Sequence, residues 1–330
     1  MESVVVDNVA CQRLASLLAG FTIPAPVEES GTDGLSRTEK GLFHLLSVAI
    51  CHQTQSLRGI VGGAEARGWD YLTQKLLARI RAQEFSLLPQ DWRSLTVESL
   101  TGLYEDPVWG RTLSDVSQRA ELIRDLSSTM SQRGWSTLDD LFAQSDGAIS
   151  SPNGLLKLLK AFHAFDDPVC KKSYFFLGLM RSDGVWIYRD PENLGPPVDY
   201  HEVRGHLRFG TVRILDATLK QRVMDRQPVG ERDDVAIRQA VHDAIMSISR
   251  FRGQPDPMTL HYVFWNLFRS VCTRENPWCA PRADAPHISN RYAHLLTRTA
   301  AGPCCPLRSD CQSATAAVRP VEHRFSTHWY

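Results

Sequence analysis

Apolar residues recur at helical spacing along most of the chain. Side chains three and four residues apart lie on one face of a helix, so each such stretch predicts an amphipathic helix packed against a core. Ser151 and Pro152 predict the N-cap and the first position of one helix, and Asp233 or Asp234 predicts the N-cap of another. The predicted helices span residues 39–52, 117–130, 152–163, 234–249 and 258–271.

A strand signal occurs in one stretch, Met180–Asp190, where a turn signal precedes the sequence Val-Trp-Ile-Tyr. Its aromatic residues Trp186 and Tyr188 could stack on a base, or they could pack on the core as a small hairpin. The remaining pattern is helical, without repeats or low-complexity tracts. The sequence therefore predicts a mainly all-α fold of closely packed helical lobes.

Length and charge narrow the classes of function. The 330 residues suffice for one large domain or two moderate ones, and 43% of them are apolar, as in ordinary globular proteins. The apolar runs are too short for a membrane span, and the first residues do not read as a signal peptide, so we expect a cytoplasmic protein without a membrane partner. The net charge is zero, so any surface for nucleic acid would be a local basic patch.

Five of the eight cysteines lie in the last fifth of the chain. A reducing cytoplasm disfavours disulfides, and thiolates are ligands for soft metals. Cys272 and Cys279 are spaced C-x6-C, and Cys305 and Cys311 are spaced C-x5-C. Zinc sites favour two to four residues between paired ligands, whereas an iron–sulfur cluster is larger and suits wider loops. Spacing alone leaves a cluster, a zinc ion and coincidence open.

The sequence around these cysteines resembles the end of the helix-hairpin-helix DNA glycosylases. The segments HYVFWNLFRSVCTRENPWC and CCPLRSDCQSA are similar to the iron–sulfur branch of that superfamily, which includes endonuclease III and the adenine glycosylases. The resemblance implies a 4Fe–4S cluster held by the two cysteine pairs. Residues 280–303 would be an insertion between the pairs, and Cys304 could replace Cys305 as a ligand. Zinc stays the alternative to the cluster.

Two earlier stretches match the same superfamily in the same order. LLSVAICHQTQSLRGIVGG resembles the helix end whose glutamine enters the DNA stack beside the extruded base, and Gln53 matches that glutamine. FDDPVCKKSYFFLGLM lies where the family has its hairpin, although both hairpin glycines are missing. Lys172 matches the lysine that attacks the sugar in bifunctional members, and Lys171 would bind a DNA phosphate. Alternatively, the two lysines are a solvated pair that binds phosphate.

The stretch GPPVDYHEVRGHLR resembles the family segment that carries the catalytic aspartate, and Asp199 matches this aspartate. Breaking an N-glycosidic bond builds positive charge on the sugar. A fixed carboxylate stabilises that cation and orients or deprotonates the nucleophile. The resemblance implies DNA contacts for His201 and Arg204. The alternative for Asp199 is a plain N-cap of the following helix.

The resemblance also implies an architecture. It predicts two helical lobes with a cleft between them, a helix-hairpin-helix motif, and a C-terminal metal-cluster loop. Residues 38–205 would form the lobe with the motif, and residues 1–37 together with 206–330 would form the lobe with the cluster.

The implied activity is base excision, in DNA repair or a related process. A monomeric, nucleoid-associated DNA glycosylase would flip a damaged or modified base out of double-stranded DNA and cleave its N-glycosidic bond, with or without AP-lyase activity. The insertions at 181–197 and 280–303 favour a modified base, for example in defence against foreign DNA. The rival hypothesis is a non-catalytic DNA- or RNA-binding module on the same scaffold, with a structural metal site.

Overall fold

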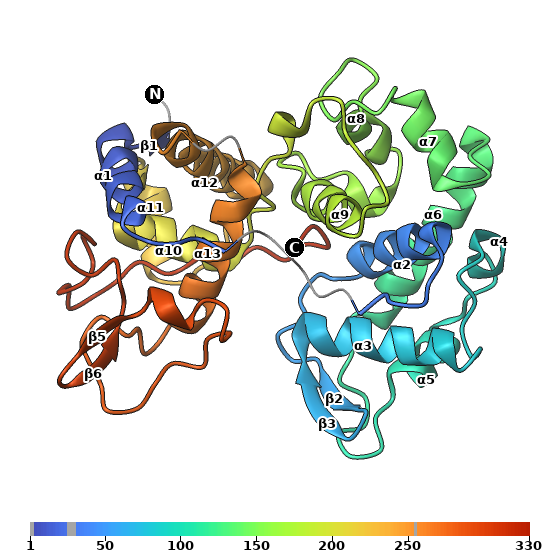
Figure 1. The fold of residues 1–330 in the computed structure, drawn as a ribbon, viewed down its shortest axis with the longest axis horizontal. Helices are drawn as coiled ribbons and strands as arrows, with labels where there is room; N and C mark the ends of the chain where they lie inside the picture. Colours follow the sequence, from blue (N-terminus) through green and yellow to red (C-terminus); the bar gives the residue numbers. More distant parts are fainter. Residues whose placement is uncertain (1–2, 25–30, 254–255) are drawn as a thin grey trace. The chain divides into compact units, whose positions relative to one another are not determined.

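Helices dominate this computed structural model, which describes residues 3–24, 31–253 and 256–330 (Figure 1). The predicted mainly helical fold is confirmed. In the described chain, no helix is long and apolar enough to cross a membrane.

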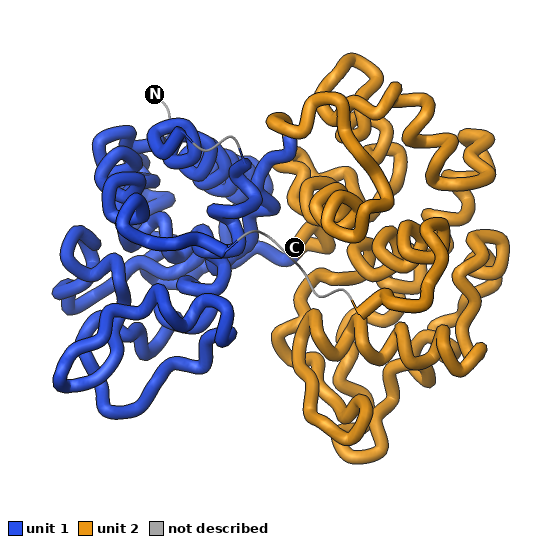
Figure 2. The backbone as a smooth tube through the Cα atoms, viewed as in Figure 1, with its two compact units in different colours: residues 1–26, 194–326 blue, residues 27–193, 327–330 orange. Residues whose placement is uncertain are grey.

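The chain divides into two units (Figure 2). Unit 1 comprises residues 1–26 and 194–326, and unit 2 comprises residues 27–193 and 327–330. The division falls after Asn193, whereas the sequence placed it after residue 205. Asp199 and the helix that follows it therefore belong to unit 1.

Unit 1 is built from segments far apart in the chain. Its elements are β1 (Val4–Val6), α1 (Asn8–Ala19), α10 (Tyr200–Phe209), β4 (Val212–Ile214), α11 (Ala217–Met224), α12 (Glu231–Phe251), α13 (Pro257–Ser270), η3 (Ala293–Leu295), β5 (Thr297–Thr299) and β6 (Gly302–Cys304). β1 pairs antiparallel with β4, so that Val4 lies opposite Ile214. α1 packs on α12, and α10 packs on α13. These contacts surround the apolar core of the unit.

The start of α12 differs from the expectation. Gly230 takes the N-cap position instead of Asp233 or Asp234. Asp234 lies in the interior, where its Oδ2 accepts from Arg238 at 2.9 Å and its Oδ1 pairs with His323 Nε2 at 2.7 Å. The predicted N-cap is therefore wrong, because this carboxylate neutralises a buried arginine instead of capping the helix.

Unit 2 is a bundle of mostly short helices with one β-hairpin. Its elements are α2 (Arg37–Ala49), β2 (Arg58–Val61), β3 (Ala64–Arg67), α3 (Gly68–Arg81), α4 (Pro89–Trp92), α5 (Val97–Tyr104), α6 (Val116–Arg133), α7 (Leu138–Gln144), α8 (Leu155–Leu159), η1 (His163–Phe165), α9 (Lys171–Ser182) and η2 (Pro191–Asn193). α2 packs on α9 and α6. Ser36 and Glu39 form a reciprocal capping box that starts α2, which fixes the direction in which this central helix enters the unit.

The strand predicted within Met180–Asp190 is wrong. α9 continues to Ser182, and the residues after it up to Asp190 form no strand. Trp186 and Tyr188 are 1% and 6% exposed, whereas Ile187 between them is 88% exposed. Trp186 stacks on Phe142 with ring centroids 5.0 Å apart. The alternation therefore reflects packing of aromatic rings on the core, and in this structure neither ring is free to stack on a base.

The helix predicted over 152–163 is interrupted. α8 covers only Leu155–Leu159, its N-cap is Gly154, and Ser151 and Pro152 lie in the preceding turn. A Cβ at Gly154 would lie 2.5 Å from the carbonyl oxygen of Ile149. The turn therefore needs glycine at this point, and the helix begins later than the Ser-Pro signal suggests.

The hairpin β2–β3 was not predicted, although the sequence carries its signal. Gly62 and Gly63 connect two four-residue strands and both have positive φ, +58° and +83°. Two-residue hairpin loops favour such residues because a positive φ at both positions matches the twist of the strands. This turn ends the stretch that resembles the family helix.

Candidate functional site

Two backbone hydrogen bonds bring the two cysteine pairs of unit 1 together. Trp278 N–H donates to Val271 O at 2.9 Å, and Cys305 N–H donates to Trp278 O at 2.8 Å. The first bond closes the loop between Cys272 and Cys279, and the second places Cys305 beside that loop. The chain therefore leaves the loop of the first pair after Cys279 and returns to that loop at Cys305.

The cysteines of the two pairs raise one another's pKa values. Burial raises the pKa of Cys305 well above its usual value, and the neighbouring Cys272, Cys311 and Cys279 raise it further. Burial, together with Cys272 and Cys279, raises the pKa of Cys311 to about 11. Cys305 and Cys311 therefore keep their protons at neutral pH, and a metal that binds them would have to displace these protons.

Cys304 stands apart from this group. It is not among the thiols that most strongly raise the pKa values of Cys279, Cys305 and Cys311. Its side chain is fully buried, and its Sγ accepts a hydrogen bond from Arg308 at 3.8 Å. Of the two adjacent cysteines, the geometry favours Cys305 as the fourth ligand.

The spread of the sulfur atoms bears on the kind of metal. Four thiolates around one zinc ion lie about 3.8 Å apart, because each Zn–S bond is about 2.3 Å long. Among the described residues, no three of these cysteines have their sulfur atoms all within 4.8 Å of one another. The described residues therefore show no assembled metal site at these cysteines, and a zinc ion and the larger body of a cluster both stay open.

Arg208 and Arg204, both on α10, hold the loop around Cys272. Arg208 donates to the carbonyl of Thr273 at 2.7 Å and to Cys272 Sγ at 3.4 Å. Arg204 donates to Cys272 O at 2.8 Å and pairs with Glu322 at 2.8 Å. Each arginine is 2% exposed. Arg204, expected to contact DNA, has its guanidinium committed to the interior of unit 1.

Asp199 occupies the start of α10, and both of its carboxylate oxygens have partners. Oδ1 accepts from the backbone N–H of His201 at 2.7 Å and of Glu202 at 3.3 Å, so Asp199 is the N-cap. Oδ2 accepts from the indole of Trp265 at 3.0 Å. The residue is half-buried. The carboxylate is thus fixed in orientation by two elements, and capping and catalysis are compatible uses of it.

His201 lies beside Asp199, and its imidazole is neutral near pH 7. Burial lowers its pKa to about 4, and Arg204 and Arg269 lower it while Asp199 opposes them. Arg204 donates to its Nδ1 at 2.9 Å, which leaves Nε2 to carry the proton of the neutral ring. A neutral imidazole offers a phosphate no ion pair, so this geometry favours a polar role next to Asp199.

Lys172 in unit 2 is not the solvated lysine of the alternative hypothesis. Its side chain is fully buried, and Nζ donates to Ala49 O at 2.5 Å. Burial lowers its pKa to about 7, with Cys51 opposing and Lys171 adding to the decrease. A half-deprotonated amine at neutral pH has the chemistry of a nucleophile, but this one faces the interior.

The segment before α9, where the resemblance places the hairpin, contains a left-handed residue that is not glycine. Cys170, which matches a hairpin glycine, has φ +59° in the left-handed region. The carboxylate of Asp167 accepts from the backbone N–H groups of Val169 at 3.0 Å and Lys171 at 2.8 Å, and its carbonyl accepts from Cys170 at 3.0 Å. The N–H groups that a phosphate would need are thus already bonded to an acidic residue. Of this segment, only the half-buried Lys171 ammonium offers charge.

Gln53 follows α2 in a left-handed conformation with φ +46°. Its side-chain amide donates to the carbonyl of Thr327 at 3.1 Å. Gln53 and Lys172 lie in unit 2, and Asp199 lies in unit 1. The expected cleft between lobes stays a prediction.

The sequence analysis did not identify Trp265 or Asp167. Trp265 orients the Asp199 carboxylate, and Asp167 holds the backbone of the segment before α9. Trp265 lies within an apolar helix that reads as core, 66 residues from its partner Asp199. Asp167 sits in the Asp-Asp-Pro turn, where turn chemistry was a usable signal because aspartate commonly accepts nearby backbone N–H groups. Neither contact follows from spacing alone.

Replacing Lys172 by methionine is expected to stabilise the protein at neutral pH. The folded pKa, about 7, lies below the unfolded value, so folding disfavours the charged form. This cost is complete below pH 7 and disappears as the pH rises toward about 10.4, where the unfolded lysine also loses its proton. Thermal melting should show a gain of about 2–4 °C per kcal/mol at pH 7 and a smaller gain at pH 10. Lys171→Met, at a half-buried neighbour, is the control. An equal gain in both variants would contradict the assignment.

Comparison with known protein families gives no matching family model, and no curated protein matches the chain. The resemblance to the helix-hairpin-helix glycosylases therefore rests on the matched stretches of sequence alone.

Proposed function

We propose that this protein is a DNA glycosylase that cleaves the N-glycosidic bond of a damaged or modified base flipped out of double-stranded DNA. The observation that carries the proposal is the Asp199 carboxylate. It is half-buried, its orientation is fixed by the start of α10 and by Trp265, and Arg204 of α10 donates to the backbone of the cysteine loop. A pre-oriented carboxylate of this kind is what a developing sugar cation requires.

In the proposed reaction, Asp199 stabilises the positive charge that builds on the sugar as the base leaves. Its fixed orientation means that little reorganisation is needed when the charge appears. The neutral His201 beside it can donate a hydrogen bond through Nε2 to the substrate or to water. Water is the nucleophile that we favour, since Lys172 Nζ is buried against Ala49 O. We therefore expect base release without strand cleavage.

The four cysteines are proposed to hold a 4Fe–4S cluster, with zinc as the alternative. When bound, the cluster supplies a rigid tie for the loop between α13 and the residues after β6. Arg208 and Arg204 fix the Cys272 backbone from the α10 side, so the tie reaches the helix that starts at Asp199.

Metal content of anaerobically purified protein tests this assignment. We expect a coloured protein that contains iron and acid-labile sulfide. A colourless protein loaded with zinc would overturn the cluster and favour the single-ion alternative.

The second candidate is a non-catalytic module that binds DNA or RNA. It is favoured by Asp167, which occupies the hairpin N–H groups, and by the use of Asp199 as an N-cap. In that case the two acidic residues would be purely structural. The partner would still be nucleic acid, and the protein would act as a monomer in the cytoplasm at the nucleoid.

Base release separates the two candidates. The protein is incubated with duplex DNA that carries a panel of damaged and naturally modified bases, and freed bases are identified by mass spectrometry. The glycosylase proposal expects at least one base to be released while the strand stays intact. DNA binding without release from any member of the panel would favour the binding module.

A further inference from the structure

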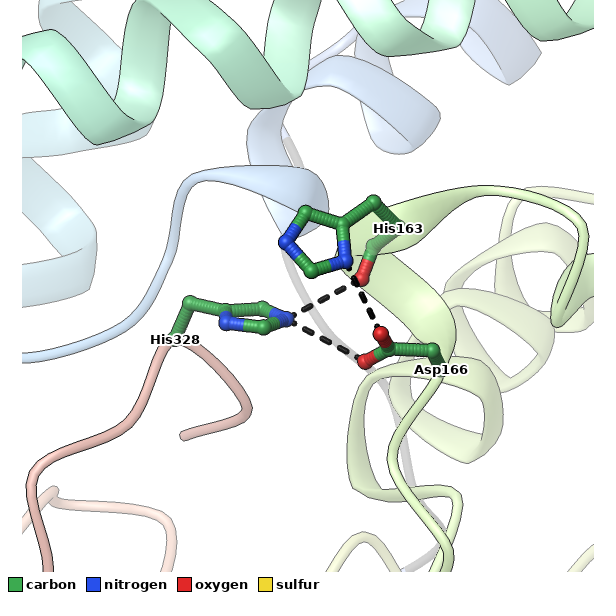
Figure 3. Close-up of side chains that lie close together, drawn as sticks. All are labelled: His163, Asp166 and His328. Atoms are coloured by element: carbon green, nitrogen blue, oxygen red, sulfur yellow. Dashed lines mark hydrogen bonds and ion pairs between the residues drawn. The ribbon is translucent and has the colours of Figure 1, made fainter.

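Unit 2 contains a second group of metal-ligating side chains, remote in sequence from the cysteines (Figure 3). His163 lies in η1, Asp166 follows it, and His328 belongs to residues 327–330. One ligand atom of each residue lies within 4.8 Å of the other two. Within the described ranges, no other three His, Cys, Asp or Glu side chains meet this criterion.

Both histidines of this group point at one carboxylate. His163 Nδ1 lies 2.9 Å from Asp166 Oδ2, and His328 Nε2 lies 3.2 Å from Asp166 Oδ1. His328 Nε2 also lies 3.0 Å from the carbonyl oxygen of His163. The two imidazole rings are 4.4 Å apart between centroids. Five polar atoms therefore converge on a small volume at the side of η1, as Figure 3 shows.

We propose that His163, Asp166 and His328 bind a divalent transition-metal ion, for which Zn²⁺ is the natural probe. Two imidazole nitrogens and one carboxylate oxygen are a common donor set for zinc and its first-row neighbours. Around tetrahedral zinc, such donors lie about 3.3–3.5 Å apart, given bonds of about 2.0–2.2 Å. The observed separations of 2.9 and 3.2 Å need to open by only a few tenths of an ångström. The ion takes the place of the protons that the nitrogens now share with the carboxylate.

The surroundings fit a bound ion. Trp329 donates its indole N–H to Asp166 Oδ1 at 2.7 Å, which fixes the carboxylate as an outer partner of a metal ligand does. The side chains of His328, Asp166 and His163 are 13%, 38% and 57% exposed. An ion can therefore enter from solvent, and water can complete its coordination.

The ion would clip residues 327–330 to unit 2. The carbonyl of Thr327, one residue before His328, accepts from the Gln53 amide. A metal at His328 would consequently hold the peptide that fixes the Gln53 side chain. This inference uses contacts within unit 2 alone and does not depend on the glycosylase proposal.

The test is a zinc titration of the protein with its cysteine-bound metal in place, monitored by calorimetry against a chelator of known affinity. The variants are His328→Gln and His163→Gln. The control is His242→Gln, because His242 Nδ1 pairs with Asp243 at 3.0 Å but belongs to no group of three ligands in the described chain. We expect wild type and the control to bind one equivalent of zinc at this site. We expect each of the two variants to bind that equivalent at least about tenfold more weakly.

A second readout reports on the site directly. The indole N–H resonance of Trp329, assigned with Trp329→Phe in protein labelled at tryptophan, should shift on addition of zinc in wild type and not in His328→Gln. Zinc affinity that is equal in wild type and His328→Gln, together with an unmoved Trp329 signal, would overturn the proposal and leave a hydrogen-bonded cluster. Because His328 lies outside the helices and strands of unit 2, its substitution is not expected to unfold the unit.

Discussion

Asp199→Asn is expected to lower the rate of base release by about 10²–10⁴-fold while the protein stays folded. Asparagine is as good an N-cap as aspartate, so α10 should still begin at the same residue. The amide has no negative charge to stabilise the sugar cation. Its NH₂ group also meets the Trp265 indole donor in place of Oδ2, which leaves that donor without an acceptor. The measurement is the single-turnover rate at which each variant releases a base that the wild-type protein frees from the panel.

Trp265→Phe is the matched variant for this prediction. It removes the indole donor and keeps the carboxylate, so a positioning role for Trp265 predicts a smaller decrease, on the order of tenfold. Melting curves of both variants report on the cap. If Asp199→Asn released base at the wild-type rate, Asp199 would be a helix cap and nothing more, and the catalytic proposal would fall.

Cys305→Ser is expected to lose the metal, whereas Cys304→Ser should retain it. Burial and the neighbouring Cys272, Cys311 and Cys279 raise the pKa of Cys305, whereas Cys304 contacts Arg308. Structural metal sites contribute on the order of 10 kcal/mol of folding free energy, which is comparable to the whole stability of a domain. Unit 1 should therefore melt at a much lower temperature without its metal. Iron content and visible absorption after purification are the measurements.

The neighbouring cysteine supplies the control, because both side chains are largely buried in the same segment. Cys304→Ser buries a hydroxyl in place of a thiol and should cost about 1–3 kcal/mol without loss of iron. Loss of iron from Cys304→Ser with retention in Cys305→Ser would reverse the assignment. Full retention of iron in both variants would show that neither Cys304 nor Cys305 is a ligand.

The helices were the predictable part of the fold. A 3.6-residue period over 234–249 or 258–271 is specific to a helix with one buried face, and α12 and α13 occupy those ranges. A period of two is less specific. The alternation around Trp186 and Tyr188 arises because single rings pack on the core, and a segment outside any strand produces the same pattern as a strand.

The ends of helices depended on distant partners. Asp234 has the sequence signature of a cap, yet its carboxylate is bonded to Arg238 and to His323, which is far away in the chain. The candidate sites likewise contain residues that the sequence indicated and residues that only the tertiary contacts identified. The spacing of the cysteines marked them as candidate ligands, but the contact of Trp265 with Asp199 and that of His328 with Asp166 are tertiary. No local pattern encodes them.

The pairing of β1 with β4 has a consequence for how the chain folds during synthesis. Residues 31–193 leave the ribosome as a continuous segment and can form nearly all of unit 2 on their own. β1, made earlier, must wait unpaired until Val212–Ile214 emerge, and α1 must wait longer for α12. The Val-Val-Val segment therefore stays without its partner strand while the whole of residues 31–193 is made, and an unpaired strand edge of this kind can pair with another chain. Residues 327–330 are made after the rest of unit 2 and dock on it.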